Sequence, residues 1–411
     1  MSNHKTPSIR FKGFTDDWEQ RKLGNVIEIA YQGINTTADK VEYVSEGVPI
    51  LQGKHITSGK IDYKDVRYLD KEKYESVYYP KYVPKVNDIL LANIGTIGPL
   101  VVMKPGVELL IAWNIMLIRL NKMGDVKFVK VFLDKLNNSN FYESIMRGNA
   151  TKFINKDGIM SIEIPYPTIC EQEKIGAWFE QLDNLITLHQ RKYEKLVNVK
   201  KSMLDKMFPK NDFKVPEIRF KGFTDDWEQR KLEDFGKATG GTSIESEFSE
   251  DGIYKVISIG SYSENSVYND QGIRAIKSDK TSNRILNRND LTMILNDKTT
   301  SGNIIGRVLL IEESGIYIYN QRTERIEINL DEYDPVFLYE MLNAPNIREK
   351  IIKQAQGNTQ IYVNWTAISL LEYMIPSKEE QVKIGEYLHS ISNLITLHQR
   401  ECKGWRKNGR I

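Results

Sequence analysis

One long segment of this chain occurs twice. The fifteen residues IRFKGFTDDWEQRKL at 9–23 recur without change at 218–232, an offset of 209 residues. At the same offset, NLITLHQR at 184–191 recurs at 393–400. Solenoid and propeller repeats have periods of roughly 20–50 residues, so this period is that of a whole domain with its connector. The chain is therefore expected to contain two large copies of one unit.

The two copies match at their edges and differ in between. Shorter matches surround the exact ones, such as Glu-Gln at 171–172 and 380–381. In contrast, residues 24–147 and 233–356 share little. Each copy thus has a repeated frame and a variable insert. This pattern indicates one task common to both frames and two different tasks of one kind for the inserts.

Both inserts mix strand and helix signals, which is typical of an α+β fold. The predicted strands are Val48–Ile56, Asp88–Gly95, Pro99–Met103, Leu109–Leu120, Ile253–Ser261, Leu291–Asn296, Ile304–Glu312 and Ile316–Ile328. The predicted helices are Phe128–Asn138, Phe141–Arg147, Pro335–Leu342 and Asn346–Gln354. We expect repeated segments at 1–23 and 211–232, mixed α/β domains at 24–167 and 233–376, and long helices at 168–210 and 377–411.

The long helices are predicted from capping boxes followed by heptads. Thr168 with Glu171, and Ser377 with Glu380, have the spacing of a capping box. Apolar residues then recur every seven positions, the pattern of helices that pair. The expected helix-pairing residues are Ile175, Phe179, Leu182, Ile186, His189, Tyr193, Leu196, Ile384, Leu388, Ile391, Ile395 and His398. An antiparallel pair would separate the two domains with approximate two-fold symmetry; two ordinary core helices in two unrelated domains remain the alternative.

Two histidines of the predicted seam allow two interpretations. His189 and His398 could share a metal ion or a proton, or they could be polar residues that fix the register of the pair. We favour the register role and expect no metal site, because no Cys, Asp or Glu is recognised at ligand spacing beside them. Beyond Arg400, Gly404 and Gly409 are expected to interrupt the second helix, which therefore resembles a truncated copy of the first.

The sequence carries no recognisable catalytic motif. It lacks the phosphate-binding GxxxxGK[ST], the nucleophile motif GxSxG and the zinc motif HExxH. Its two cysteines form no CxxC, its net charge is only +2, and its longest apolar run is too short to span a membrane. A recognition or assembly component in the cytoplasm is therefore expected.

The repeated frame resembles that of the specificity subunit of type I restriction–modification enzymes. The residues that carry the resemblance are DDWEQRKLG at 16–24 and DDWEQRKL at 225–232, IPYP at 164–167 with EQEKI at 171–175, and IP at 375–376 with EQVKI at 380–384. PILQGKHITSGKI at 49–61 and Asn-Asp-Ile-Leu at 87–90 are similar to segments of that family's inserts. The resemblance covers nearly the whole chain, including the duplicated order.

This resemblance implies that each insert is a target recognition domain for one half of a bipartite, asymmetric site in double-stranded DNA. It implies that the helices set the gap between the two halves of the site and that they bind two adenine methyltransferase (modification) subunits. Motor–nuclease (restriction) subunits would complete the complex. This chain would then hold no cofactor and catalyse nothing, and S-adenosylmethionine, ATP and Mg²⁺ would belong to its partners. A protein–protein adaptor without a DNA role, or a truncated inactive specificity subunit, are the alternatives.

Base contacts require polar side chains on loops that can face the edges of base pairs. On that basis the candidate DNA-binding residues are Gln52, Lys54, His55, Thr96, Thr151, Lys152, Lys298, Thr299, Thr300, Gln321, Arg322 and Gln360.

Overall fold

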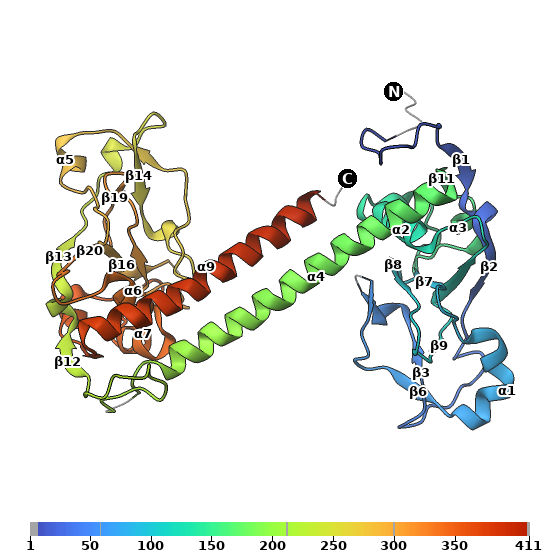
Figure 1. Cartoon of the computed structure of the whole chain (residues 1–411), viewed down its shortest axis with the longest axis horizontal. Coiled ribbons are helices and arrows are strands. Elements are labelled where there is room, and N and C mark those ends of the chain that lie inside the picture. The colour runs from blue at the N-terminus through green and yellow to red at the C-terminus, as the bar shows by residue number, and fades with distance from the viewer. Residues whose placement is uncertain (1–6, 58, 211–212, 299–300, 409–411) are drawn as a thin grey trace. The chain divides into compact units, whose positions relative to one another are not determined.

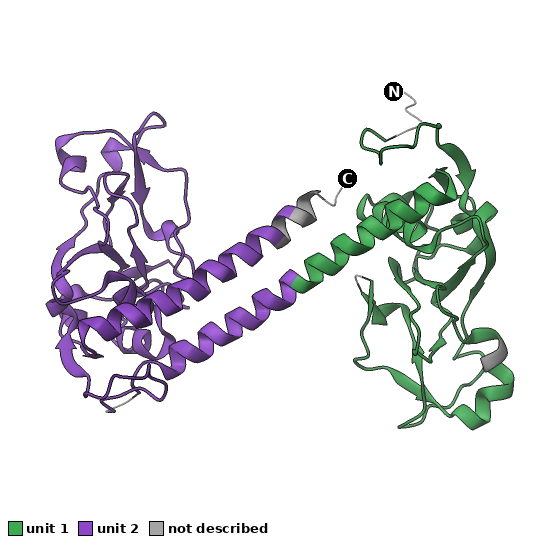
Figure 2. Cartoon of the chain, in the orientation of Figure 1, with its two compact units in different colours: residues 1–188, 405–411 green, residues 189–404 purple. Residues whose placement is uncertain are grey.

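The protein forms two compact units of mixed α+β structure. The computed structural model describes residues 7–57, 59–210, 213–298 and 301–408. Residues 1–188 with 405–411 make up unit 1, and residues 189–404 make up unit 2 (Figure 2). Both units contain helices and strands, with runs of consecutive strands, which confirms the expected α+β fold class (Figure 1).

Unit 1 contains a four-stranded and a three-stranded sheet. The four-stranded sheet has the order β2 (Ile27–Gln32), β10 (Ile115–Leu120), β7 (Ile89–Ile94), β8 (Thr96–Val102), all antiparallel. The three-stranded sheet has the order β6 (Arg67–Leu69), β3 (Val48–Leu51), β9 (Leu110–Ile111), with β3 and β9 parallel. Smaller pairs are β1 (Glu19–Lys22) with β11 (Glu163–Tyr166) and β4 (Ile56–Thr57) with β5 (Lys60–Ile61). The helices are α1 (Lys71–Tyr82), α2 (Val126–Asn138) and α3 (Lys156–Met160).

Unit 2 repeats this topology with a different sequence. Its four-stranded sheet has the order β13 (Gly236–Gly240), β20 (Thr323–Ile328), β16 (Leu291–Ile294), β18 (Val308–Leu310). Its three-stranded sheet has the order β15 (Arg274–Ala275), β14 (Tyr254–Ile257), β19 (Tyr317–Tyr319), and β14 and β19 are again parallel. The pairs are β12 (Glu228–Lys231) with β22 (Glu372–Ile375) and β17 (Asn296–Asp297) with β21 (Ile361–Tyr362). The helices are α5 (Asp279–Ser282), α6 (Pro335–Asn343), α7 (Pro345–Ile352) and α8 (Trp365–Ser369).

Most predicted elements of the inserts overlap observed ones, but some differ. The predicted strand Ile316–Ile328 is two strands, β19 and β20, with a turn between them. The predicted strand Leu109–Leu120 is two strands, β9 and β10, because the backbone turns where the amide of Ile115 bonds the carbonyl of Ala112. Helix α1 was not predicted. Its core-facing side consists of three tyrosines four residues apart, Tyr74, Tyr78 and Tyr82, and most of its other described side chains are exposed. Tyrosine is also common in strands, so this spacing was not recognised as the apolar face of a helix.

The long helices are α4 (Ile169–Lys206) and α9 (Lys378–Asn408), with 38 and 31 residues. They begin at equivalent positions of the repeat. The prediction that Gly404 interrupts the second helix is wrong, because α9 continues through it to Asn408. Glycine lowers helix stability by about 1 kcal/mol relative to alanine, which a helix of this length tolerates. Gly409 lies outside the described residues.

An arginine of the repeated frame forms an ion pair with a buried glutamate at the start of each long helix. In unit 1, the guanidinium of Arg10 donates to both carboxylate oxygens of the buried Glu171, at 2.7 and 2.8 Å. In unit 2, Arg219 makes the same pair of bonds to the buried Glu380, both at 2.8 Å. The two arginines come from the fifteen-residue repeat.

The capping-box prediction is only partly confirmed. The hydroxyl of Ser377 accepts the amide of Glu380 at 3.4 Å, as predicted. The carboxylates of Glu171 and Glu380 were expected to reach back to their own helix ends. Both instead hold the arginine of the repeated segment, and the indole of Trp18 also donates to Glu171 at 3.1 Å. The repeated glutamate is thus a tertiary anchor.

A glycine lets each long helix approach the insert behind it. A Cβ at Gly385 would lie 2.8 Å from Oδ1 of Asp334 and 2.9 Å from the amide nitrogen of Phe337. These two groups form the N-cap of α6, where the Asp334 carboxylate accepts the Phe337 amide at 2.7 Å. Gly176 approaches the N-cap of α2 in the same way. The matched glycines of the repeat therefore mark close helix contacts.

We expect Gly385→Ala to lower the free energy of unfolding of unit 2 by about 1–3 kcal/mol, the usual cost of overpacking. The matched control is Gly404→Ala on the same helix, where a Cβ would meet nothing within 4 Å. The control should raise helix stability by up to about 1 kcal/mol. Thermal unfolding of both variants measures the difference, and equal effects would show that the close contact is absent.

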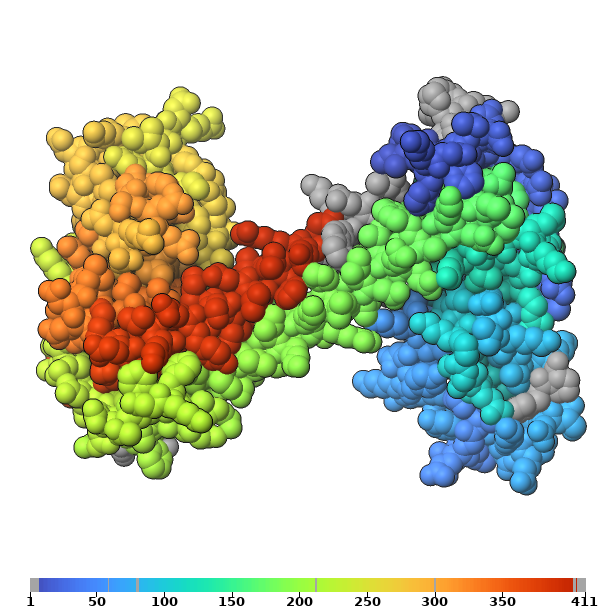
Figure 3. Space-filling view, in the orientation of Figure 1, coloured from blue at the N-terminus to red at the C-terminus, as the bar shows by residue number. Residues whose placement is uncertain are grey.

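Within unit 2, the second half of α4 lies antiparallel beside α9. The ammonium of Lys200 donates to Oγ of Ser392 at 2.7 Å and pairs with the buried Glu340 of α6 at 2.8 Å. Eleven residues earlier on α4, His189 contacts His398, six residues later on α9. The space-filling view shows the start of α9 resting on the rest of its unit (Figure 3).

The predicted pairing residues differ in how deeply they are buried and in what they pack against. Ile384 and Leu388 are buried in the main core of unit 2, and Ile175 packs against the core of unit 1. Ile391 is buried as well. The other predicted pairing residues are half-buried: Phe179, Leu182, Ile186, His189, Tyr193, Leu196, Ile395 and His398. Pairing by the remainder of the seam stays a prediction.

Among the described residues, every helix is too short or too polar to cross a membrane.

Candidate nucleic-acid interface

Three loops of unit 2 meet where strand β16 leads into β17. The amide of Leu295 bonds the carbonyl of Arg322 at 2.9 Å, and its carbonyl accepts the amide of Val363 at 2.8 Å. Asn296 then pairs with Tyr362 in the β17–β21 ladder. These bonds join the segment at 295–297, the turn before β20 and the loop before β21. We call this meeting point the loop corner of unit 2.

Unit 1 has an equivalent loop corner around Asn93 of β7. Its amide bonds the carbonyl of Asn114 at 3.2 Å, and its carbonyl accepts the amide of Ile154 at 2.9 Å. One residue beyond β7, the amide of Gly95 bonds the carbonyl of Lys152 at 3.0 Å. The turn after β7, the turn before β10 and the loop at 147–153 therefore meet as their counterparts do in unit 2.

The third loop of each corner turns on a glycine of the repeat. Gly148 and Gly357 have φ of +91° and +100°, a conformation that residues with a Cβ rarely adopt. A Cβ would also lie 2.3 Å from the carbonyl oxygen of Thr151 or 2.1 Å from that of Gln360. This geometry explains why glycine occupies both of these equivalent positions, 148 and 357. The turn leaves residues 148–152 and 357–360 exposed.

The two corners bring most of the predicted DNA-binding residues together. Thr96, Thr151 and Lys152 lie exposed at the corner of unit 1. Gln52 and Lys54 adjoin it, because the Gly53 amide between them donates to the side-chain oxygen of Asn114 at 3.1 Å. In unit 2 the predicted residues at the corner are Lys298, Gln321, Arg322 and Gln360, whereas Thr299 and Thr300 lie outside the described residues.

His55 is not available to read a base. Its side chain is buried, and its Nδ1 accepts the amide of Gln52 at 3.0 Å. Burial lowers the pKa of the ring, with a smaller contribution from Lys54 in the same direction. His55 therefore braces the turn that carries its neighbours, and we leave it out of the proposed interface.

Two residues of the corners escaped prediction. Trp113 in unit 1 is 41% exposed and lies in the turn that corresponds to Gln321-Arg322 of unit 2. Arg348 of α7 is buried and donates to the carbonyls of Gly302, Asn303 and Ile305 at 2.8–2.9 Å, so it anchors the segment at 302–305. A single exposed Trp and a helical Arg have no pattern in the sequence that distinguishes these roles.

Strand β20 of unit 2 carries a buried carboxylate, Glu324. Burial raises the pKa of this group to about 7, and nearby Arg284 opposes the shift only in part. The folded-state pKa lies above the ordinary value of 4.5. Stability is therefore lost as the pH rises from about 4.5 to 7, because the folded state resists ionisation. Glu324→Gln should stabilise unit 2 at pH 8 by on the order of 2–3 kcal/mol and have little effect near pH 4.

Urea unfolding at pH 4.5 and 8 measures this difference. The matched control is Glu327→Gln, an exposed carboxylate on the same strand, which should not change the pH dependence. If Glu324→Gln were as neutral as the control at both pH values, burial would not be the cause of the shift.

The chain thus contains two copies of one fold, and each copy has exposed polar loops at one corner of its sheet. A family model of the type I restriction modification DNA specificity domain matches residues 15–198 and again 224–403. The chain belongs to this family.

Similar proteins agree with that assignment. The chain is 27% identical to the type I restriction enzyme MjaVIII specificity subunit of Methanocaldococcus jannaschii over 94% of this chain and 88% of the relative. It is 24% identical to the putative MjaX specificity subunit of the same organism, over 94% and 89%. Its fold matches the crystal structure of a type I S subunit from M. genitalium with a TM-score of 0.64, covering 98% and 96% of the two chains at 14% identity.

Proposed function

We propose that each unit reads one half of a bipartite, asymmetric DNA site through its loop corner. The observation that carries this proposal is that two inserts of unlike sequence build the same corner and place different side chains on it. A shared scaffold gives both units the same approach to a duplex. The different side chains then give the two halves of the site different sequences.

The corner residues have the chemistry of base recognition. Arginine pairs with two acceptors of guanine in the major groove, and glutamine pairs with the matching edge of adenine. Arg322 and Gln360 offer these groups in unit 2. In unit 1, Thr151 and Lys152 offer hydrogen bonds and Trp113 offers an apolar face, which suits the methyl group of thymine.

The long helices are proposed to bind two copies of one partner. Unit 1 exposes Trp178, Leu185 and Leu188 on one face of α4, and unit 2 exposes the equivalent residues of α9. The equivalent residues, each at an offset of 209, are Tyr387, Leu394 and Leu397. Exposed apolar stripes mark protein interfaces. Two matching stripes are expected to bind two identical chains, for which the family suggests the methyltransferase subunits.

In this proposal the chain is a non-catalytic recognition subunit. The methyltransferase and restriction subunits supply catalysis and carry S-adenosylmethionine, ATP and Mg²⁺. Helix α4, with its 38 residues, is about 57 Å long and serves as the spacer between the two readers. Access to cellular DNA is the reason for proposing a cytoplasmic location.

The direct test of the function is to map methylated adenines in the DNA of cells with and without this chain, in the presence of the partner subunits. The proposal predicts a methylated sequence with two unlike halves and a fixed gap that appears only with the chain. Unchanged methylation, with the complex shown to be assembled, would leave the chain as an adaptor without a DNA role.

A further inference from the structure

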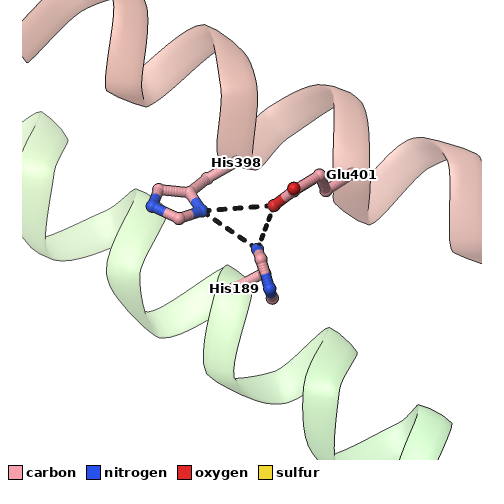
Figure 4. A group of neighbouring side chains, drawn as sticks. All are labelled: His189, His398 and Glu401. Atoms are coloured by element: carbon pink, nitrogen blue, oxygen red, sulfur yellow. Dashed lines mark hydrogen bonds and ion pairs between the residues drawn. The ribbon is translucent and has the colours of Figure 1, made fainter.

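Three potential metal ligands converge where α9 lies beside α4 within unit 2. Nδ1 of His189 lies 3.0 Å from Nδ1 of His398, and the carboxylate of Glu401 contacts the first ring and lies 3.5 Å from the second (Figure 4). From the sequence, no acidic residue was expected at ligand spacing beside these histidines. That expectation was wrong, because Glu401 lies one helical turn after His398 and faces the same point.

The distances suit one small cation. Zn²⁺ binds nitrogen and oxygen ligands at about 2.0–2.2 Å in a tetrahedron, which places the ligand atoms about 3.3 Å from one another. Two of the three separations, 3.0 and 3.5 Å, lie on either side of this value. The third, between the Glu401 carboxylate and His189, is shorter, so the carboxylate has to move away from His189 when an ion binds. With the proton on Nε2 in both rings, the two Nδ1 atoms and the carboxylate would all direct lone pairs to the common point. A single proton can bridge only one pair of them, whereas a metal ion satisfies all three.

The surroundings favour a closed but hydrated site. The side chains of the two histidines are only 15% and 14% exposed, and that of Glu401 is 35% exposed, so water can reach one side as a fourth ligand. Imidazole with carboxylate is a ligand set typical of Zn²⁺ and its neighbours, and not of Mg²⁺ or Ca²⁺, which prefer oxygen.

The site contains one carboxylate because the two copies differ directly after the matching block NLITLHQR. The two histidines occupy equivalent positions of NLITLHQR. The next residue after each matching block is Lys192 in the first copy and Glu401 in the second. A lysine at both positions would repel a cation, so the divergence of the copies creates the ligand set.

We propose that His189, His398 and Glu401 bind one divalent transition-metal ion of the Zn²⁺ type and so fasten the second half of α9 to α4. A bound ion stabilises the helix pair most where few apolar side chains are buried between the two helices. Beyond Ile391, Leu394 and Leu397 of α9 are exposed, and Ile395 is only half-buried. The ion therefore holds the part of the helix pair that the hydrophobic core does not reach.

The test is calorimetric titration of the full chain, stripped of metal with a chelator, with ZnCl₂ and in parallel with MgCl₂. We expect one equivalent of Zn²⁺ to bind and to raise the unfolding temperature, and Mg²⁺ to do neither. Co²⁺ in its place should give the visible absorption of a tetrahedral site with nitrogen and oxygen ligands, which reports ligation independently of function.

Three variants test the ligands one by one: His398→Gln, Glu401→Gln and Glu401→Lys, the last of which reproduces the residue of the first copy. Each should weaken Zn²⁺ binding at least about tenfold, and circular dichroism checks that each is folded. Glu194→Gln, an exposed carboxylate on α4, is the control and should bind Zn²⁺ as the parent does. Zn²⁺ binding that is absent in the parent, or unchanged in all three variants, would reduce the cluster to a hydrogen-bonded ion pair.

Discussion

Replacing Arg219 with methionine is expected to lower the free energy of unfolding of unit 2 by about 3–5 kcal/mol. Its guanidinium holds Glu380, a carboxylate with no exposed surface at the start of α9. The variant leaves that charge buried without a partner, which costs more than the intact pair contributes. Hydrogen exchange of unit 2 amides and thermal unfolding of the full chain measure the loss.

The control for this variant is Arg230→Met in the same repeated segment. Arg230 pairs with Glu228 at the surface, where both side chains are largely exposed. Such pairs contribute about 0–1 kcal/mol. Arg10→Met should weaken unit 1 in the same direction as Arg219→Met weakens unit 2. If Arg219→Met were as mild as the control, the repeated segment would not anchor the long helix.

Replacing Leu394 with glutamate is expected to remove one of two bound partner subunits. The side chain lies in the middle of the exposed apolar stripe of α9, and Leu185 is its equivalent on α4. A charge buried in an apolar interface should weaken binding by at least about 2 kcal/mol, or about 30-fold. Sizing the assembled complex should show one partner subunit with either Leu394→Glu or Leu185→Glu, and none with both.

The matched controls add the same charge off the stripe. Asn184 and Asn393 precede these leucines, are exposed and are themselves equivalent in the repeat. Asn184→Glu and Asn393→Glu should retain both partner subunits. Full binding by the leucine double variant would show that the stripes are not the docking surface.

Repetition was the most informative property of the sequence. Exact matches located the frame, and capping boxes with heptads predicted long helices from 168 and 377, one residue before α4 and α9 begin. Because the repeated residues recur in one register, their contacts are also repeated, as Arg10–Glu171 and Arg219–Glu380 show. The nature of those contacts was not predictable, since a capping box and a tertiary ion pair require the same glutamate.

The shared topology of the inserts was much harder to predict than the frame. A sheet is specified by an apolar pattern that many sequences satisfy, so two domains can share strand order with few identities. One clue was present in the Asn-Asp pairs at 87–88 and 289–290. Each asparagine has positive φ, and each aspartate is buried and binds an arginine, Arg119 or Arg325, of the neighbouring strand.

The candidate site could be predicted only in part. Polar loop residues are visible in a sequence, so Thr96, Thr151 and Gln360 were identified and lie at the loop corners. Burial is a tertiary property, so the sequence did not show that His55 is buried or that Arg348 anchors a loop. The acidic member of the histidine cluster was overlooked although Glu401 follows His398 by three residues, which is a visible helical spacing. Only its contact to His189 joins residues far apart in the chain.

The central claim is that each unit reads its own half of one DNA site, and methylation mapping with corner variants tests it most directly. Arg322→Ala and Gln360→Ala, each in the complete complex, should relax the sequence of one half by about 1–3 kcal/mol of discrimination at the affected base pair. The other half and the gap should stay as they are. Relaxation of both halves together, or of neither half in an assembled and active complex, would contradict the account.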